Sequence, residues 1–170
     1  NSESKCKICD AGKHGPAAAA KCISCVKGKY LQDEGTVVSD HDNENDCHIC
    51  SSGMYTELSA SSGCSVCKAG TFLVDNAAAA TAHDSENDCT TCGSGKYSSS
   101  KAASCTSCVK GKYLEDAGTS ADFHNSESKC KICDAGKHGP AAAAKCISCV
   151  KGKYLQDEGT VVSDHDNEND

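Results

Sequence analysis

Residues 22–30 read CISCVKGKY, and this stretch decides how the chain folds. It places a glycine three residues after a C-x2-C pair and an aromatic ring two residues after that glycine. Such a glycine indicates a turn that needs a positive φ or a close backbone approach. We expect a short strand to follow it, as at residues 29–31 or 71–73. Eight stretches fit C-x2-C-x2-G-x-[YFH]: residues 6–14, 22–30, 47–55, 64–72, 89–97, 105–113, 130–138 and 146–154.

The composition cannot support a single hydrophobic core. Leu, Ile, Val and Phe number 21 of the 170 residues, about 12%, and there is no Trp. The chain has 16 cysteines, an even number. These features predict a disulfide framework made in an oxidising compartment, so we expect an extracellular or secreted protein, at the cell surface or in an appendage. The ring that ends each stretch is then expected to pack locally on a neighbouring disulfide, and a ligand contact is the alternative.

Long repeats organise the chain. Residues 1–46 recur without a change as residues 125–170, an offset of 124 residues. Two diverged relatives lie between these copies. Between successive cysteine pairs, a short gap of 12 or 13 residues alternates with a long gap of 21 residues. The chain divides into four cysteine-rich modules, the fourth a copy of the first: residues 1–46, 47–88, 89–129 and 130–170.

The charge and the apolar pattern argue against two classes of partner. The formal net charge is −7 and all 17 basic residues are lysine, whereas phosphate recognition favours arginine, so we expect no nucleic acid. No apolar run reaches membrane-spanning length, so we expect no membrane insertion. No signal peptide is visible at the first residue, and we expect a mature segment or an interior window of a longer secreted chain.

The repeated stretch resembles the cysteine-rich modules of tumour-necrosis-factor receptors and, more closely, the Eph-receptor-like cysteine-rich repeats of large secreted proteins. The likeness covers nearly the whole chain. Residues 88–98, DCTTCGSGKYS, also look like repeats of long algal surface and flagellar-hair (mastigoneme-type) proteins. The resemblance implies small disulfide-rich repeats, arranged as an elongated ladder of short β-hairpin and turn units with little helix and no single hydrophobic core.

The resemblance also implies a disulfide pairing. In the receptor modules, the cysteine before Gly-x-Tyr bonds the first cysteine of the next pair. Carried over to the short gaps, this rule joins Cys9 with Cys22, Cys50 with Cys64, Cys92 with Cys105 and Cys133 with Cys146. The chain lacks the further cysteines that the receptor modules use at the long gaps, so we expect sequential pairing there too: Cys25 with Cys47, Cys67 with Cys89 and Cys108 with Cys130. We expect Cys6 and Cys149 to bond adjoining repeats.

A zinc-binding interpretation competes with disulfides, because 16 thiolates in C-x2-C pairs could form four sites of four cysteines each. The composition and the regular spacing favour disulfides. A thioredoxin-like redox role needs one reactive pair on a βαβ frame, and this chain has eight equivalent pairs. No residue stands in a recognisable catalytic setting, so we expect no catalytic residue, no cofactor and no enzyme activity.

Two polar features are candidate sites, with solvated loops as the alternative for both. In an extended segment, the carboxylates of Asp40, Asp42, Glu44 and Asp46 would lie on one side and could bind Ca²⁺. Serines in loops of a secreted stalk could carry O-linked glycans, and the candidates are Ser61, Ser62, Ser98, Ser99 and Ser100.

Repeated histidines are more often surface residues, so we expect a surface position for all seven: His14, His41, His48, His83, His124, His138 and His165. The alanine runs at residues 17–20, 77–80 and 141–144 are candidates for close approach between neighbouring units, and the first two for a single helical turn.

These observations predict a structural subunit of an extracellular fibre or surface appendage. Its partners would be copies of itself or further repeats of the same chain, and glycans. An unchanged recurrence of 46 residues suits translational regularity, whereas ligand-binding modules would be expected to differ from one another. The alternatives are a receptor or adhesion stalk that binds a protein ligand, and a repeat protein that holds several zinc ions.

Overall fold

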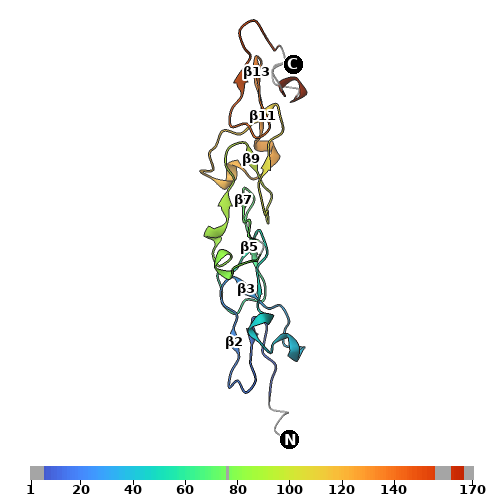
Figure 1. The fold of residues 1–170 in the computed structure, drawn as a ribbon, viewed down its shortest axis with the longest axis vertical. Coiled ribbons are helices and arrows are strands. Elements are labelled where there is room, and N and C mark those ends of the chain that lie inside the picture. Colours follow the sequence, from blue (N-terminus) through green and yellow to red (C-terminus); the bar gives the residue numbers. More distant parts are fainter. Residues whose placement is uncertain (1–5, 76, 156–161, 167–170) are drawn as a thin grey trace. The chain divides into compact units, whose positions relative to one another are not determined.

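The computed structural model describes residues 6–75, 77–155 and 162–166, and only the backbone at residues 162 and 164. The chain forms two compact units. Figure 1 labels several of the strands from which they are built. The first comprises residues 1–67 and 73–89, and the second comprises residues 68–72 and 90–170.

Both units are built from antiparallel β-hairpins whose strands are two residues long. The first unit contains β1 (Lys13–His14) paired with β2 (Ile23–Ser24), β3 (Lys29–Tyr30) with β4 (His48–Ile49), and β5 (Met54–Tyr55) with β6 (Ser65–Val66). The second contains β7 (Thr71–Phe72) paired with β8 (Thr90–Thr91), β9 (Lys96–Tyr97) with β10 (Thr106–Ser107), β11 (Lys112–Tyr113) with β12 (Lys131–Ile132), and β13 (Lys137–His138) with β14 (Ile147–Ser148).

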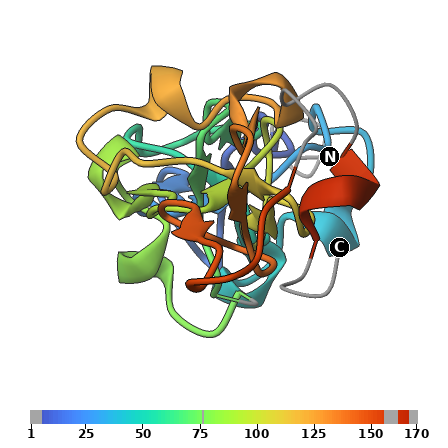
Figure 2. The ribbon, with the colours of Figure 1, turned by 90° about the horizontal axis from the view of Figure 1, so that it is seen from above.

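Helical structure in the described residues is limited to short 3-10 turns in the long gaps. They are η2 (Val38–Asp40), η3 (Glu44–Asp46), η4 (Ala80–Ala82), η5 (Glu86–Asp88), η6 (Ala121–Phe123), η7 (Glu127–Lys129) and η8 (Val162–His165). In the second unit, η6 and η7 lie on the outside of the ribbon (Figure 2). None of these turns has the length and apolar character that a membrane-crossing helix needs, as far as the described residues go.

In seven of the eight repeated stretches, the glycine makes the turn that starts a hairpin among the described residues. At Gly28, φ is +78°, and the Lys29 amide donates to the carbonyl of Val26 (3.1 Å) to close the turn. All eight equivalent glycines have positive φ, as predicted: Gly12, Gly28, Gly53, Gly70, Gly95, Gly111, Gly136 and Gly152. The two residues inside each following C-x2-C pair supply the second strand, so each pair belongs to two neighbouring hairpins.

A disulfide closes each of the seven hairpins, with Cα atoms 5.6–6.0 Å apart. The pairs are those that the resemblance implied: Cys9–Cys22, Cys25–Cys47, Cys50–Cys64, Cys67–Cys89, Cys92–Cys105, Cys108–Cys130 and Cys133–Cys146. The prediction of small disulfide-stapled hairpin units with little helix is confirmed.

Buried atoms gather in small clusters, and no single core forms among the described residues. Each cluster joins a disulfide to a leucine of the same hairpin: Cys25, Leu31 and Cys47 in the first unit, and Cys108, Leu114 and Cys130 in the second. Burying a leucine contributes about 1.5–3 kcal/mol, so these clusters supply only a modest hydrophobic term.

Within each unit, a loop packs against the turn of the hairpin two positions earlier. A Cβ at Gly12 would collide with the carbonyl of Ala60, and one at Gly95 with the carbonyl of Ala142. The Ala142 amide donates to the carbonyl of Cys108 (2.9 Å). Each such glycine therefore needs both its positive φ and its missing side chain.

The alanine runs differ from one another in structure. In the run at residues 141–144, Ala143 is buried and forms a β-bridge with Tyr113, which is a close approach of the kind expected. The run at residues 17–20 forms a turn in which Ala19 donates to Pro16 (3.0 Å), and no helical turn is present there. Only Ala80 of the run at residues 77–80 belongs to a 3-10 turn.

Candidate functional site

The cysteines act as cross-links. Fourteen of the 16 form the seven disulfides, and the remaining thiols are the exposed Cys6 and the half-buried Cys149. Two thiols cannot make a four-cysteine zinc site. No group of three or more His, Cys, Asp or Glu side chains in the described residues is placed to hold a metal ion. A framework with this many disulfides is typical of an oxidising, extracellular or secretory environment.

A buried histidine fastens each long gap to the preceding hairpin. The four residues, which we call the histidine latches, are at most 3% exposed: His41, His83, His124 and His165. Their Nδ1 atoms lie 2.7 Å from a backbone carbonyl of that hairpin, at Lys13, Met54, Lys96 and Lys137 respectively. Their own carbonyls accept hydrogen bonds of 2.8–2.9 Å from the amides of Gly15, Thr56, Ser98 and Gly139.

An aspartate eight residues earlier in the chain faces the other ring nitrogen of three latches. The Nε2–carboxylate distance is 2.9 Å between His41 and Asp33 and 2.8 Å between His124 and Asp116. A carbonyl and a carboxylate can only accept, so the His41 ring satisfies both when it is protonated and donates from both nitrogens. At His83 the nearest carboxylate oxygen, from Asp75, lies 3.6 Å away.

These contacts shift the pKa values of Asp33 and His41 in opposite directions. Hydrogen bonds from the hydroxyl and the amide of Thr36, with a further one from His41, lower the pKa of Asp33 well below its usual value. Burial is the largest single influence on His41 and disfavours its charged form. The carbonyl of Lys13 and the carboxylate of Asp33 together outweigh it, so the pKa of His41 is raised. The pair therefore carries opposite charges in weakly acidic solution.

The prediction of surface histidines is wrong for the four latches and for His14, which is 7% exposed. Each latch lies in a polar stretch, but the long gap folds back over a hairpin whose accepting carbonyl is 28 or 29 residues earlier in the chain. A sequence signal was available, because an aspartate precedes the latches His41, His83 and His124 by eight residues and a cysteine follows each by six. His48 is exposed and His138 is half-buried.

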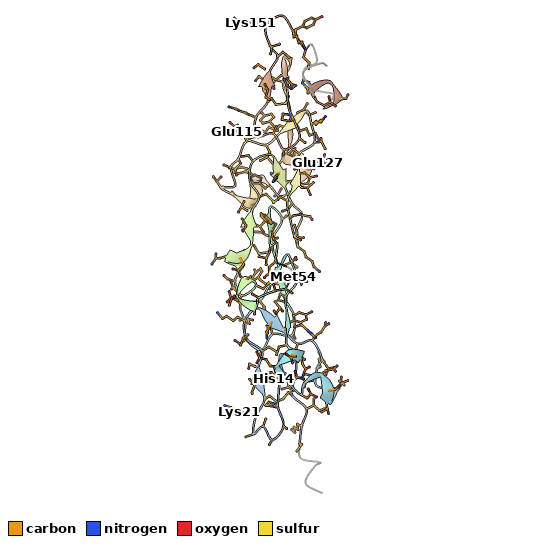
Figure 3. All side chains as sticks on the ribbon, viewed as in Figure 1. His14, Lys21, Met54, Glu115, Glu127 and Lys151 are labelled. Carbon is orange, nitrogen blue, oxygen red and sulfur yellow. A yellow bond between two sulfur atoms is a disulfide. The ribbon has the colours of Figure 1, made fainter. Side chains whose placement is uncertain are left out.

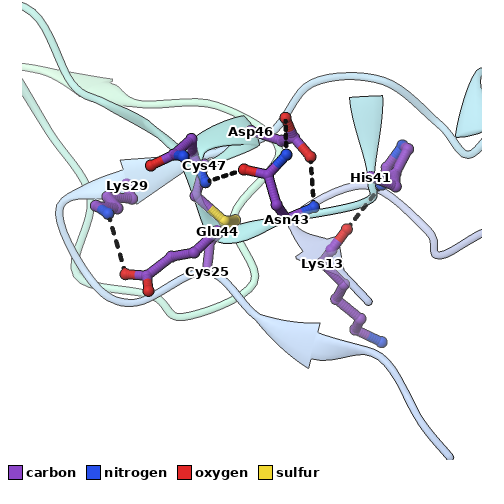
Figure 4. Close-up of a disulfide and its surroundings, with 9 residues drawn as sticks. Lys13, Cys25, Lys29, His41, Asn43, Glu44, Asp46 and Cys47 are labelled. Atoms are coloured by element: carbon purple, nitrogen blue, oxygen red, sulfur yellow. Dashed lines mark hydrogen bonds and ion pairs between the residues drawn. A yellow bond between two sulfur atoms is a disulfide. The ribbon is translucent and has the colours of Figure 1, made fainter. Parts of the chain in front are cut away.

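The acidic segment at residues 40–46 does not form the extended strand that calcium binding would need. It folds into two turns, and its carboxylates take separate partners (Figure 4). Asp46 accepts from the Asn43 amide (2.9 Å) in a capping box, and Glu44 pairs with Lys29 (3.4 Å). Asp40 and Asp42 are exposed. The expected one-sided row of oxygens is therefore absent.

Ser98 is not available for a glycan, so the prediction for this residue is wrong. Its side chain is buried, and its hydroxyl donates to the carbonyl of Thr71 (2.9 Å). The Ser98 amide donates a hydrogen bond to the carbonyl of the latch His124. Among the other candidates, Ser61 is half-buried, and Ser62, Ser99 and Ser100 are exposed.

The aromatic rings pack mostly against their own surroundings. Tyr97 contacts the cluster around the Cys108–Cys130 disulfide. The rings of Tyr30 and His48 meet edge to face with centroids 6.1 Å apart. Tyr154 differs, since it is 81% exposed.

Two equivalent surface hollows have different linings. In the first unit, a hollow of about 440 Å³ lies beside Tyr30 and is lined by Asp40, Asp46 and His48, among others. In the second unit, a hollow of about 430 Å³ lies beside Tyr113, and the corresponding positions are Phe123, Lys129 and Lys131. We call the second hollow, defined by Tyr113, Phe123, Lys129 and Lys131, the lysine groove. Glu115 also lines it and points outward (Figure 3).

The described residues form disulfide cross-links, histidine latches and a surface groove. We identify no catalytic set of nucleophile, base and orienting group among them. No protein-family model matches the chain, and no curated protein sequence matches it.

Proposed function

We propose that this chain is a structural subunit of an extracellular fibre or surface appendage, and that it is not an enzyme. The observation that carries the proposal is the unchanged recurrence of residues 1–46 at residues 125–170. A segment that recurs without a substitution suits an assembly in which equivalent contacts repeat along an axis. On this proposal its partners are copies of itself, and its exposed serines are available for glycans.

The recurrence of the contacts supports the same function. The turn glycine and the disulfide recur in successive modules. The hydrogen bonds of the histidine latch also recur, each to a backbone group at the equivalent position. Because the latches and turns use main-chain carbonyls, side chains at other positions can vary without a change in the repeat. We also propose that the repeats are related to Eph-receptor-like or tumour-necrosis-factor-receptor-like modules.

Negative-stain electron microscopy of the secreted, oxidised chain tests the proposal. We expect polymers of uniform width that grow with protein concentration. Isolated particles that bind a soluble protein partner would instead support a receptor or adhesion stalk and would overturn the fibre.

A further inference from the structure

The lysine groove differs from its counterpart at the positions that set its chemistry. The corresponding hollow presents Asp40, Asp46 and His48, whereas the groove presents Phe123, Lys129 and Lys131. Two carboxylates are thus replaced by a phenyl ring and an ammonium group, and an imidazole by a second ammonium group. The chain is net acidic, so two adjacent exposed lysines beside an exposed ring are a local reversal of its surface charge.

The two lysine charges of the groove are not neutralised by ion pairs within the described residues. Neither Lys129 nor Lys131 has a carboxylate partner there, although Lys112 nearby is paired with Glu127 (3.2 Å). The carboxylate of Asp116 is engaged by Thr119 and His124. This leaves two lysines and the exposed Glu115 at the groove.

Phe123 is the apolar element of the groove and is 54% exposed. A phenyl ring in η6 with this exposure contributes little to the fold of its own hairpin. Together with the half-buried Tyr113, it offers an apolar surface beside two ammonium groups, which suits a partner that combines an aliphatic side chain with carboxylates.

Residues 37–42 of the same chain have this combination. Val37 and Val38 are 44% and 65% exposed. Asp40 and Asp42 are exposed, and neither is paired with a lysine in the part of the chain that the structure describes. Asp40 helps to raise the pKa of His41. The 3-10 turn η2 holds Val38 and Asp40 on one short, ordered loop, so this segment loses little conformational freedom on binding.

We infer that the lysine groove of one copy binds residues 37–42 of a second copy. Val38 contacts Phe123, and the carboxylates of Asp40 and Asp42 pair with Lys129 and Lys131. The contact rests on the proposed self-assembly and gives it a specific pair of surfaces.

The two surfaces are different patches of one chain, so the contact is head to tail. Each copy that joins uses one patch and leaves the other open for the next copy. Contacts of this type generate open polymers, or rings where the rotation closes.

Charge reversal on both sides provides the test, by sedimentation of the oxidised 170-residue chain at low and high salt. Residues 37–42 recur unchanged in sequence as residues 161–166, so the acidic variant reverses both copies. We expect K129E/K131E and D40K/D42K/D164K/D166K each to weaken self-association by about ten-fold or more, because like charges then face each other. An equimolar mixture should associate within about three-fold of the unaltered chain, since each variant then offers the charge that the other needs. Raising the salt from 20 to 300 mM should weaken the unaltered chain's association.

The matched control is K68E/K110E, which reverses two exposed turn lysines and changes the net charge equally. It should leave self-association within about two-fold of the unaltered chain. A mixture that does not recover, or a control that is as damaging as K129E/K131E, would overturn the contact. Two lysines could instead bind an anionic polysaccharide such as heparin. If K129E/K131E lost heparin binding but kept its self-association, the contact would also be overturned.

The experiment separates this contact from the fibre proposal. Polymers that form regardless of both reversals leave the fibre standing and reject the contact. Salt-sensitive association that follows the charge swap but ends in closed rings supports the contact and rejects an open fibre. Retention of the seven disulfides in each variant, checked by thiol counting, excludes misfolding as the cause.

Discussion

His41 and Asp33 show how single polar residues hold a loop in a chain that has few apolar ones. The ring is 3% exposed and spans from a carboxylate of its own loop to a carbonyl of the preceding hairpin. Hydrogen bonds to charged groups contribute more than neutral ones, so the buried His41 ring can fix a 21-residue gap without a hydrophobic core.

The shifted pKa values predict that this latch is strongest in mildly acidic solution. The lowered pKa of Asp33 gives stability that is present above the usual aspartate pKa of about 3.9 and is lost as the pH falls through the folded value. The raised pKa of His41 gives stability that is fully present below about 6.5 and is lost as the pH rises through its folded value. We therefore expect maximal protection between roughly pH 4 and 6.5.

Hydrogen exchange of the Gly15 amide, which donates to the carbonyl of His41 (2.8 Å), measures this effect after correction for the intrinsic rate. The variant Asp33→Asn removes the carboxylate charge and should flatten the profile. Protection that increases steadily from pH 6 to pH 8 would contradict the charged-pair explanation.

Ala77 occupies a position where the equivalent residues are Gly35 and Gly118. Its φ is +62°, and those of the two glycines are +78° and +92°. A left-handed conformation costs a residue with a Cβ about 1–2 kcal/mol. We expect Ala77→Gly to raise the free energy of unfolding by about 0.5–1 kcal/mol, because glycine's greater freedom in the unfolded chain offsets part of the gain.

Ala79→Gly is the control for this change. Ala79 has an extended backbone (φ −142°, ψ 130°), so glycine relieves no strain there and should lower stability by about 0.5–1 kcal/mol. Denaturant unfolding of the oxidised chain distinguishes the two variants. If Ala77→Gly lowered stability as much as Ala79→Gly does, the positive φ of Ala77 would not be strained.

At the scale of elements, two-residue strands cannot persist as independent hairpins in water. Here each hairpin has a glycine turn at its start and a disulfide at its base, and a loop from two hairpins later packs on the turn within each unit. Each hairpin is therefore stable only when it is packed against neighbouring hairpins, which is the usual behaviour of stacked repeats.

Gly95 tests that dependence, because it combines φ of +70° with the carbonyl of Ala142 where a Cβ would lie. We expect Gly95→Ala to lower the free energy of unfolding by about 2–4 kcal/mol and to expose the 133–146 loop to protease. Gly93 lies in the same turn and has open space around its missing Cβ, so Gly93→Ala should change stability by less than about 0.5 kcal/mol. Similar losses for the two variants would contradict the packing argument.

The sequence predicts the parts of each element that depend on short spacing. The turn glycines and the strands after them follow from C-x2-C-x2-G-x-[YFH], and the disulfide pairs follow from a resemblance based on that same pattern. The histidine latches were missed, because their rings bond to a hairpin nearly 30 residues earlier. The paired 3-10 turns were missed as well, although their caps are local, as in the capping box of Asn43 and Asp46. Ser98 was misjudged for the same reason, since the carbonyl that accepts its hydroxyl is 27 residues away.

At the scale of the whole molecule, cross-links replace the hydrophobic interior. Closing a loop of 13 to 22 residues stabilises a folded chain by about 3 kcal/mol in the loop-entropy description. We expect full reduction to unfold the chain at 25 °C, which circular dichroism and size-exclusion chromatography with and without dithiothreitol would detect. A reduced chain that keeps the elution volume and spectrum of the oxidised one would contradict this account.

Because each C-x2-C pair serves two neighbouring disulfides, only two residues separate one cross-link from the next between Cys9 and Cys146. A pulling force is then carried along a covalent route of sulfur bridges and three-residue steps, roughly 100 Å at full stretch, whereas the backbone between the same residues could reach roughly 470 Å. Even when every hydrogen bond has broken, the oxidised chain can lengthen only slightly under force. The backbone inside the disulfide loops can extend only after the disulfides have been reduced.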